Sequence, residues 1–140
     1  MRKMIVLGVL VAVVCGLVPA AWAGSSIPTC LISNGGSGGR FTKSVICVEL
    51  IDRGDGQAGS GSYAPGDNTP HWLTVTVEYQ PLGRPSSVWL PLATTIKRGS
   101  GQLRATTRPV RLPSPGVLRA CTRAGTGTGT MIRQLCSISD

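Results

Sequence analysis

The sequence predicts an all-β protein: a single small antiparallel β-sandwich, immunoglobulin-like, with about seven strands and two disulfides. Apolar and polar residues alternate in several short segments, and 19 glycines and 10 prolines separate many of these segments. After residue 23, no window of about eleven residues keeps the apolar spacing of a helix without a glycine or proline. We therefore expect little helix.

The clearest predicted strand is His71 to Gln80, in which four apolar residues alternate with Trp72, Thr74, Thr76 and Glu78. The same alternation predicts six further strands: Ile27 to Ser33, Ser44 to Ile51, Ser86 to Ala93, Gln102 to Arg108, Gly116 to Arg123 and Thr130 to Ile138. Seven strands fit one sandwich domain over residues 24–140.

The first 23 residues have the pattern of a secretory signal peptide. Arg2 and Lys3 precede an apolar run from Met4 to Val18, and Ala21-Trp22-Ala23 offers small residues for cleavage near Ala23. The run is shorter than the roughly 20 residues that span a bilayer, and no later run is as long, so we expect a secreted mature chain without a transmembrane segment. The alternatives are a membrane anchor or a lipid-modified Cys15.

Four cysteines follow the predicted signal peptide: Cys30, Cys47, Cys121 and Cys136. An even number in a small exported chain is typical of two disulfides, and no C-x-x-C pair supports the alternative of a zinc site. A glycine-rich run lies between the two members of each consecutive pair, as in a hairpin. This arrangement favours Cys30–Cys47 and Cys121–Cys136.

The alternative pairing is a bridge from Cys47 to Cys121 through the core, as in immunoglobulin domains. Cys47 shares a strand face with Glu49, and Cys121 shares one with Arg119 and Arg123. A bridge through the core would therefore bring charged side chains inward, so we favour the hairpin pairing.

Asp52 to Pro70 is expected to be a loop of about 19 residues, because five glycines and two prolines interrupt it. It contains Arg53-Gly54-Asp55, which could be an adhesion signal, a calcium site completed by Asp67 and Asn68, or a turn. We interpret it as a turn at the end of a strand, followed by a flexible loop.

Residues for catalysis are scarce, so we expect no enzyme activity, no cofactor and no bound metal. The chain has a single histidine, His71, at the start of a predicted strand and expected on the surface or at a strand edge. No G-x-S-x-G sequence occurs, and no serine or carboxylate motif stands near His71.

Charge is distributed unevenly. Residues 24–79 carry a net charge of −2 and residues 80–140 carry +8. We expect Arg104 with Arg108, and Arg119 with Arg123, to share strand faces and to bind an anionic polymer or cell-surface component. Nucleic acid is an unlikely partner because few aromatic residues are available for stacking and no recognition helix is predicted. The alternative is that the charge only keeps the protein soluble.

Two tryptophans are further candidates for a binding site. Trp72 and Trp89 alternate out of phase with the apolar residues of their segments, so both should point outward. They could form a sugar-binding platform, or they could cover a strand edge.

The segment TCLISNGGSGGRFTKSVICVELIDRGDG resembles the first disulfide region of the secreted actinobacterial subtilisin-inhibitor family. The similarity spans about a fifth of the chain. In that family the second cysteine pair surrounds a reactive-site loop in the middle of the domain, whereas Cys121 and Cys136 lie near the C-terminus. The resemblance therefore implies no reactive-site residue and no membership of the family.

Together, these patterns predict a small secreted binding protein without enzyme activity. Its binding residues would be Arg104, Arg108, Arg119, Arg123, Trp72 and Trp89, and its partner an anionic surface or polymer such as a cell wall or envelope. The alternative is a factor that binds another protein, such as a protease inhibitor or a toxin.

Overall fold

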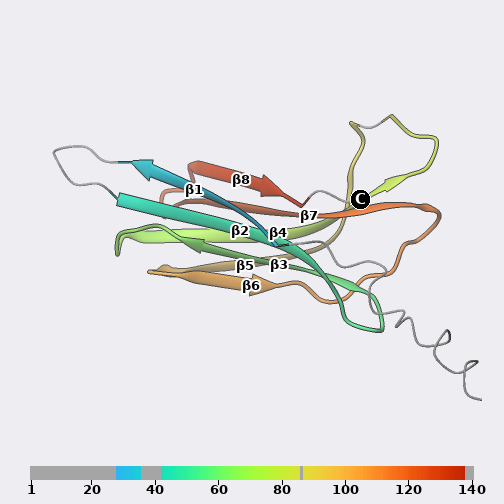
Figure 1. Ribbon diagram of the computed structural model, residues 1–140, viewed down its shortest axis with the longest axis horizontal. Helices are drawn as coiled ribbons and strands as arrows, with labels where there is room; N and C mark the ends of the chain where they lie inside the picture. Colours follow the sequence, from blue (N-terminus) through green and yellow to red (C-terminus); the bar gives the residue numbers. More distant parts are fainter. Residues whose placement is uncertain (1–27, 36–41, 86, 138–140) are drawn as a thin grey trace, which may run out of the picture.

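A computed structural model describes residues 28–35, 42–85 and 87–137, and in these residues every regular element is a β-strand (Figure 1). No helix among them is long and apolar enough to cross a membrane. The predicted signal peptide lies outside the described residues. The strands are β1 (Thr29–Gly35), β2 (Thr42–Asp52), β3 (Gln57–Ala64), β4 (Pro70–Pro81), β5 (Leu90–Ser100), β6 (Leu103–Thr106), β7 (Gly116–Thr126) and β8 (Met131–Cys136).

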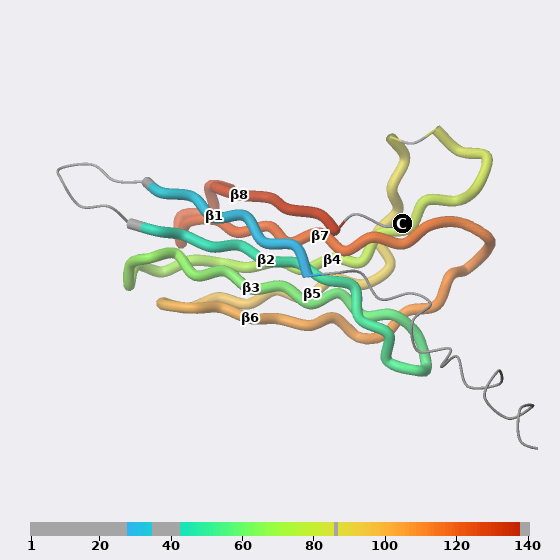
Figure 2. The backbone as a smooth tube through the Cα atoms, in the orientation of Figure 1, coloured from blue at the N-terminus to red at the C-terminus, as the bar shows by residue number. Residues whose placement is uncertain are grey.

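The strands form two antiparallel four-stranded sheets, with the orders β1-β2-β3-β6 and β5-β4-β7-β8. The chain completes β1, β2 and β3 before it enters the second sheet at β4, and it returns to the first sheet only for β6 (Figure 2). Without β3, the order would be that of the A-B-E and C′-C-F-G strands of an immunoglobulin-like sandwich. The predicted all-β sandwich is confirmed, and β3 is an additional strand between β2 and β6.

Both predicted disulfides, Cys30–Cys47 and Cys121–Cys136, are present. Each joins directly opposed residues of neighbouring strands, β1 with β2 and β7 with β8. Within β2, Ile46 and Val48 are buried on the inner face, so Cys47 projects from the outer face of its sheet. The alternation argument for this pairing is therefore confirmed.

Apolar side chains from both sheets pack between them and form the core. Ile46, Leu73, Val75 and Val77 are completely buried, and Val48 is 1 % exposed. These residues belong to β2 and β4, two strands rich in branched aliphatic residues that fit a pleated, buried surface.

The prediction of a loop over Asp52–Pro70 is wrong, because Gln57 to Ala64 form β3 in the middle of the first sheet. The sequence QAGSGSYA lacks large aliphatic residues, so it does not have the usual pattern of a strand. Gly59 and Gly61 face the core, where a Cβ atom would lie 3.0 Å from Cγ2 of Val77 and 2.8 Å from Cγ2 of Val75, respectively. The small residues allow the second sheet to approach closely.

The predicted strands correspond to the other seven, with some different bounds. Residues 86–89 precede β5, which instead continues to Ser100, well beyond the predicted end at Ala93. The predicted strand to Arg108 ends at Thr106. The longer β5 includes Lys97 and Arg98, and the shorter β6 excludes Arg108. Both differences change which basic residues lie on the strands of the candidate site.

Candidate functional site

The outer face of the β5-β4-β7-β8 sheet carries most of the predicted binding residues. Trp72, Thr74, Thr76 and Glu78 project from β4, because the residues between them are buried on the core side. Each lies between one residue of β5 and one of β7. The cross-strand neighbours are Arg98 and Gly125 for Trp72, Ile96 and Arg123 for Thr74, Thr94 and Cys121 for Thr76, and Pro91 and Arg119 for Glu78.

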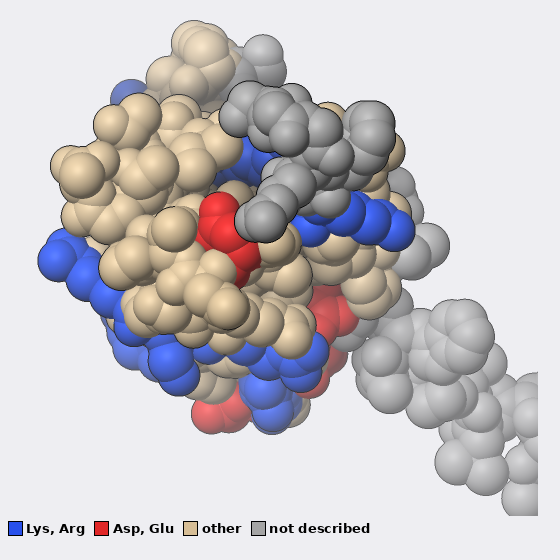
Figure 3. Space-filling model, turned by 90° about the vertical axis from the view of Figure 1, so that its left-hand side faces the viewer, with Lys and Arg blue, Asp and Glu red and all other residues tan. Residues whose placement is uncertain are grey.

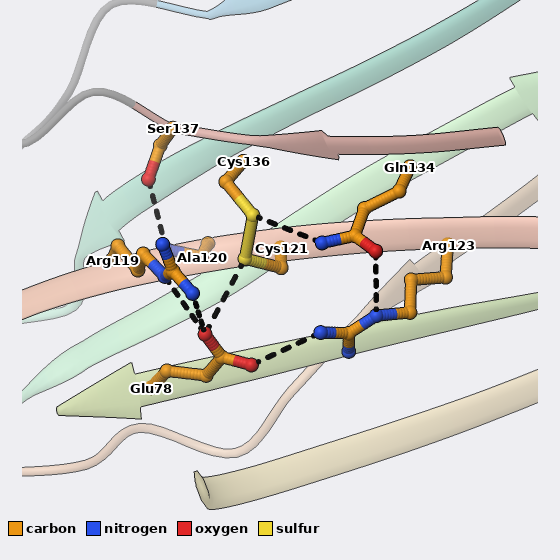
Figure 4. Close-up of polar contacts among 8 residues, drawn as sticks. All are labelled: Glu78, Arg119, Ala120, Cys121, Arg123, Gln134, Cys136 and Ser137. Atoms are coloured by element: carbon orange, nitrogen blue, oxygen red, sulfur yellow. Dashed lines mark hydrogen bonds and ion pairs between the residues drawn. A yellow bond between two sulfur atoms is a disulfide. The ribbon is translucent and has the colours of Figure 1, made fainter. Parts of the chain in front are cut away.

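Glu78 is the centre of a polar network on this face (Figure 4). Its Oε2 accepts a hydrogen bond of 2.7 Å from Nε of Arg119 and forms an ion pair with Nη2 of the same residue at 2.7 Å, and its Oε1 accepts a hydrogen bond of 3.2 Å from Nη2 of Arg123. Nε of Arg123 also donates to Gln134 at 3.3 Å. The side chain of Glu78 is only 10 % exposed, so the two guanidinium groups stabilise a carboxylate that is largely removed from water.

The second disulfide and Trp89 enclose this network. Sγ of Cys121 lies 3.5 Å from Oε2 of Glu78, and as a disulfide sulfur it has no proton to donate. The guanidinium carbon of Arg119 lies 4.0 Å from the centroid of the Trp89 ring. Trp89 therefore covers a paired arginine and lies at the opposite end of β4 from Trp72, about 20 Å away along the strand. The structure does not bring the two tryptophans into one platform.

Arg119 and Arg123 share a face as predicted, but Arg104 and Arg108 do not join them. Arg104 projects from β6 on the outer face of the other sheet, and the outer faces of two packed sheets point in opposite directions. Arg108 lies beyond the end of β6, and its Nη2 donates to the backbone oxygen of Leu92 at 3.1 Å. The expected patch of four arginines is therefore wrong.

Another group of basic residues lies at one end of the sandwich, two from each sheet. Lys43 begins β2, Lys97 and Arg98 lie near the end of β5, and Arg104 begins β6; the strand pairings place these positions at the same end. All four are exposed, and none forms an ion pair with another described residue. We call Lys43, Lys97, Arg98 and Arg104 the loop-end cations. In a view of this end, lysine and arginine occupy more of the surface than aspartate and glutamate (Figure 3).

A groove of about 600 Å³ opens at the same end of the molecule. Trp72, Thr74, Ile96 and Arg98 line it from the sheet, and residues 127–129 of the β7–β8 hairpin line it near the start of β4. Trp72 is half-buried, whereas Ile96 is 60 % exposed and Arg98 is also exposed. The groove thus combines an aromatic ring, an aliphatic side chain and an arginine that forms no ion pair within the described part of the chain.

A smaller hollow of about 250 Å³ lies on the outer face of the first sheet, over the Cys30–Cys47 disulfide. Ser60 and Ser62 line it together with Glu49 and Arg104. The hollow forms because two serines on β3 lie between longer side chains of β2 and β6. It has no aromatic ring, so it offers fewer kinds of contact than the groove beside Trp72.

The Arg53-Gly54-Asp55 segment is the tight turn between β2 and β3. Arg53 donates its backbone N–H to the oxygen of Gly56 at 2.8 Å, and Gly54 has a φ of 82°. Oδ1 of Asp52 accepts the N–H of Gly54 at 2.8 Å. The prediction of a turn is confirmed, while β3 replaces the flexible loop expected after it.

The alternative calcium site requires Asp67 and Asn68 to approach Asp52 and Asp55. The two pairs lie at opposite ends of β3, whose eight residues extend roughly 26 Å. Oδ1 of Asp67 instead accepts hydrogen bonds from the hydroxyl and backbone N–H of Thr69. Among the described residues, no group of three or more histidine, cysteine, aspartate or glutamate side chains could hold a metal ion.

His71 lies at the start of β4 as predicted, but the expectation of a surface or strand-edge residue is wrong. It is 5 % exposed, and β4 is a central strand of its sheet. Its Nδ1 donates to the backbone oxygen of Thr69 at 2.6 Å, and its ring meets the edge of Tyr63 with the centroids 5.6 Å apart. Burial raises the pKa of Tyr63 above its ordinary value of 10.0. His71 therefore has a structural environment within the core.

Arg98 and Ile96, the groove residues contributed by β5, were not predicted as site residues. The predicted strand ended at Ala93, so neither residue was assigned a face. Thr94-Thr95-Ile96 is rich in β-branched residues, which would have supported a longer strand. The pairing of Arg98 with Trp72 could not be predicted without the sheet order.

Comparison of the chain with protein-family models, with curated proteins and with solved structures finds no match.

Proposed function

We propose that this protein is exported and binds an anionic polymer or surface, without enzyme activity, through the loop-end cations Lys43, Lys97, Arg98 and Arg104. Their shared position, exposure and lack of ion-pair partners among the described residues are the observation that supports this function. Such a group creates a positive local field that attracts polyanions. The signal-like N-terminus and the two disulfides agree with export to an oxidising compartment.

Arg119 and Arg123 are poorer candidates for this contact than the sequence suggested. Both already bind Glu78, and a polymer anion would have to compete with a carboxylate at 2.7 Å and 3.2 Å. Arg108 and Arg111 also donate to backbone oxygens, those of Leu92 and Asp55. Within residues 28–35, 42–85 and 87–137, the loop-end cations have no comparable partner to release before they bind.

Retention on immobilised polyglutamate at increasing salt concentration tests this proposal. We expect the triple variant Lys97→Gln, Arg98→Gln, Arg104→Gln to elute at clearly lower salt than the unmodified protein, because exposed charge interactions are screened by ions. The matched control is Arg53→Gln, Arg84→Gln, Arg111→Gln, which removes the same number of charges from the opposite end.

A small loss for the control and a large loss for the loop-end variant would support the proposal. Equal losses would show that only net charge matters. Absence of retention at low salt would show that the protein does not bind such polymers. Thermal unfolding of both variants checks that the substitutions leave the fold intact.

A further inference from the structure

The position of Trp72 is set by a glycine on the neighbouring strand. A Cβ atom at Gly125 would fall inside contact distance of Cε2 and Cζ2 of Trp72, so only glycine leaves room for the indole against β7. The indole therefore lies on the sheet with one side against the backbone and contributes to the groove of about 600 Å³. This volume falls within the usual range of about 300–1,000 Å³ for small-ligand sites.

The β7–β8 hairpin forms a fixed wall of the groove. Gly127 donates its N–H to the oxygen of Pro70 at 2.9 Å, which attaches the hairpin to the start of β4. Gly129 donates to the oxygen of Thr126 at 2.9 Å, and the hydroxyls of Thr126 and Thr128 are 2.8 Å apart. A wall that is already hydrogen-bonded loses little conformational freedom when a ligand binds.

The groove residues differ in chemistry in a way that suits one class of ligand. The Trp72 ring and Ile96 offer apolar surface for the C–H groups of a saturated ring. Arg98 lies directly across from Trp72 on β5, and its planar guanidinium suits a carboxylate or phosphate group. Thr74 and Thr128 add hydroxyls that both donate and accept hydrogen bonds.

From this combination we propose that the groove binds a sugar ring that carries a carboxylate or phosphate group. Such a ring has C–H groups for Trp72, hydroxyls for the threonines and an anionic group for Arg98. This inference rests on the proposed function and deepens it, because the ring would be a repeating unit of the anionic polymer. A polymer that carries charge but no sugar ring would gain no affinity from contact with Trp72.

Calorimetric titration with four polymers tests this inference: polygalacturonate, phosphorylated dextran, neutral dextran and polyglutamate. The first two carry an anionic group on a sugar ring, and the last two lack either the charge or the ring. We expect at least one of the first two to bind about tenfold more tightly than polyglutamate of equal charge density, a difference equivalent to about 1.4 kcal/mol. The two anionic sugars distinguish a carboxylate from a phosphate as the recognised group.

Two pairs of variants locate the site. Arg98→Gln should remove most of the preference for the anionic sugar, whereas Arg84→Gln, an equal charge loss at the opposite end of the sandwich, should preserve it. Trp72→Leu should remove the preference and leave polyglutamate binding within about twofold, whereas Trp89→Leu should preserve the preference. The arginine pair keeps the test decisive if Trp72→Leu fails to fold, since both arginines are exposed.

Equal binding of polygalacturonate, phosphorylated dextran and polyglutamate would overturn this inference and leave the proposed function standing. The same conclusion follows if Arg98→Gln and Arg84→Gln lose the preference to the same extent. Equal binding of neutral dextran and the anionic sugars would also overturn it. If none of the charged polymers binds, the proposed function fails as well.

Discussion

Thr122 on β7 is completely buried between the sheets, and its Oγ1 has no hydrogen-bond partner among the described residues. A buried hydroxyl without a partner loses its contacts with water and gains none in return. We expect Thr122→Val, which keeps the shape of the side chain, to raise the free energy of unfolding by about 1 kcal/mol. Urea denaturation measures the change.

Thr122→Ser is the matched control, because it keeps the unpaired hydroxyl and removes only the methyl group. This variant should be less stable than the unmodified protein. If Thr122→Val proves destabilising, the hydroxyl has a partner that the structure does not place.

Asp67 provides a prediction about pH. The hydroxyl and backbone N–H of Thr69, at 2.7 Å and 3.0 Å from Oδ1, hold the pKa of Asp67 below its ordinary value of 3.8. A carboxyl whose pKa is lower in the folded state stabilises the fold above its unfolded pKa, and this contribution is lost as the pH falls through the folded pKa. We therefore expect part of the acid destabilisation below about pH 4 to arise from Asp67.

Asp67→Asn keeps an oxygen that can accept from Thr69 but does not titrate. The free energy of unfolding of this variant, followed from about pH 5 to pH 2, should fall less steeply than that of the unmodified protein. Identical slopes would show that the hydrogen bonds to Thr69 do not distinguish the charged from the neutral carboxyl.

At the scale of single elements, β3 is a strand with little inward side-chain volume, because the opposite sheet lies close to it. Its inward positions 59 and 61 are glycines, and the next inward position is Tyr63. A methyl group at Gly61 would lie 2.8 Å from Cγ2 of Val75 and still closer to Oγ1 of Thr122. The sheets can approach at this point only because the side chain is absent.

We expect Gly61→Ala to lower the free energy of unfolding by about 1–3 kcal/mol, because the added methyl overpacks the core. Ser62→Ala, one position along the same strand and on its outer face, should change stability by less than about 0.5 kcal/mol. Chemical denaturation of the two variants tests the difference. Similar stability of both variants would indicate that the sheets separate easily near β3.

The alternation of apolar and polar residues predicted the strands that carry branched aliphatic side chains. It failed for β3, where small residues line the core. The strand with Ile46 and Val48 and the strand with Val75 and Val77 were found in nearly their full length, and the disulfide pairing followed from the same pattern. β3 was missed because glycine is normally a sign of a turn. Its role depends on Val75 and Thr122, which are distant in sequence.

At the scale of the whole molecule, the charge asymmetry of the sequence does not become a charged face. The basic second half contributes β5, β7 and β8 to one sheet but β6 to the other. Its arginines are therefore divided between opposite faces, and Glu78 from β4 neutralises part of the charge on β7. Only the sheet order could reveal that Lys43 from the acidic half joins Lys97, Arg98 and Arg104 at one end.

The two disulfides also determine how the fold would respond to mechanical load. Cys30 is the second residue of β1, and Cys136 is the last residue of β8. A force applied at the two ends would therefore pass through covalent bonds into Cys47 on β2 and Cys121 on β7, and residues 31–46 and 122–135 would carry no tension. Because β2 and β7 are interior strands of their sheets, the force would act on strands with a neighbour on each side and could not first peel away the edge strands β1 and β8.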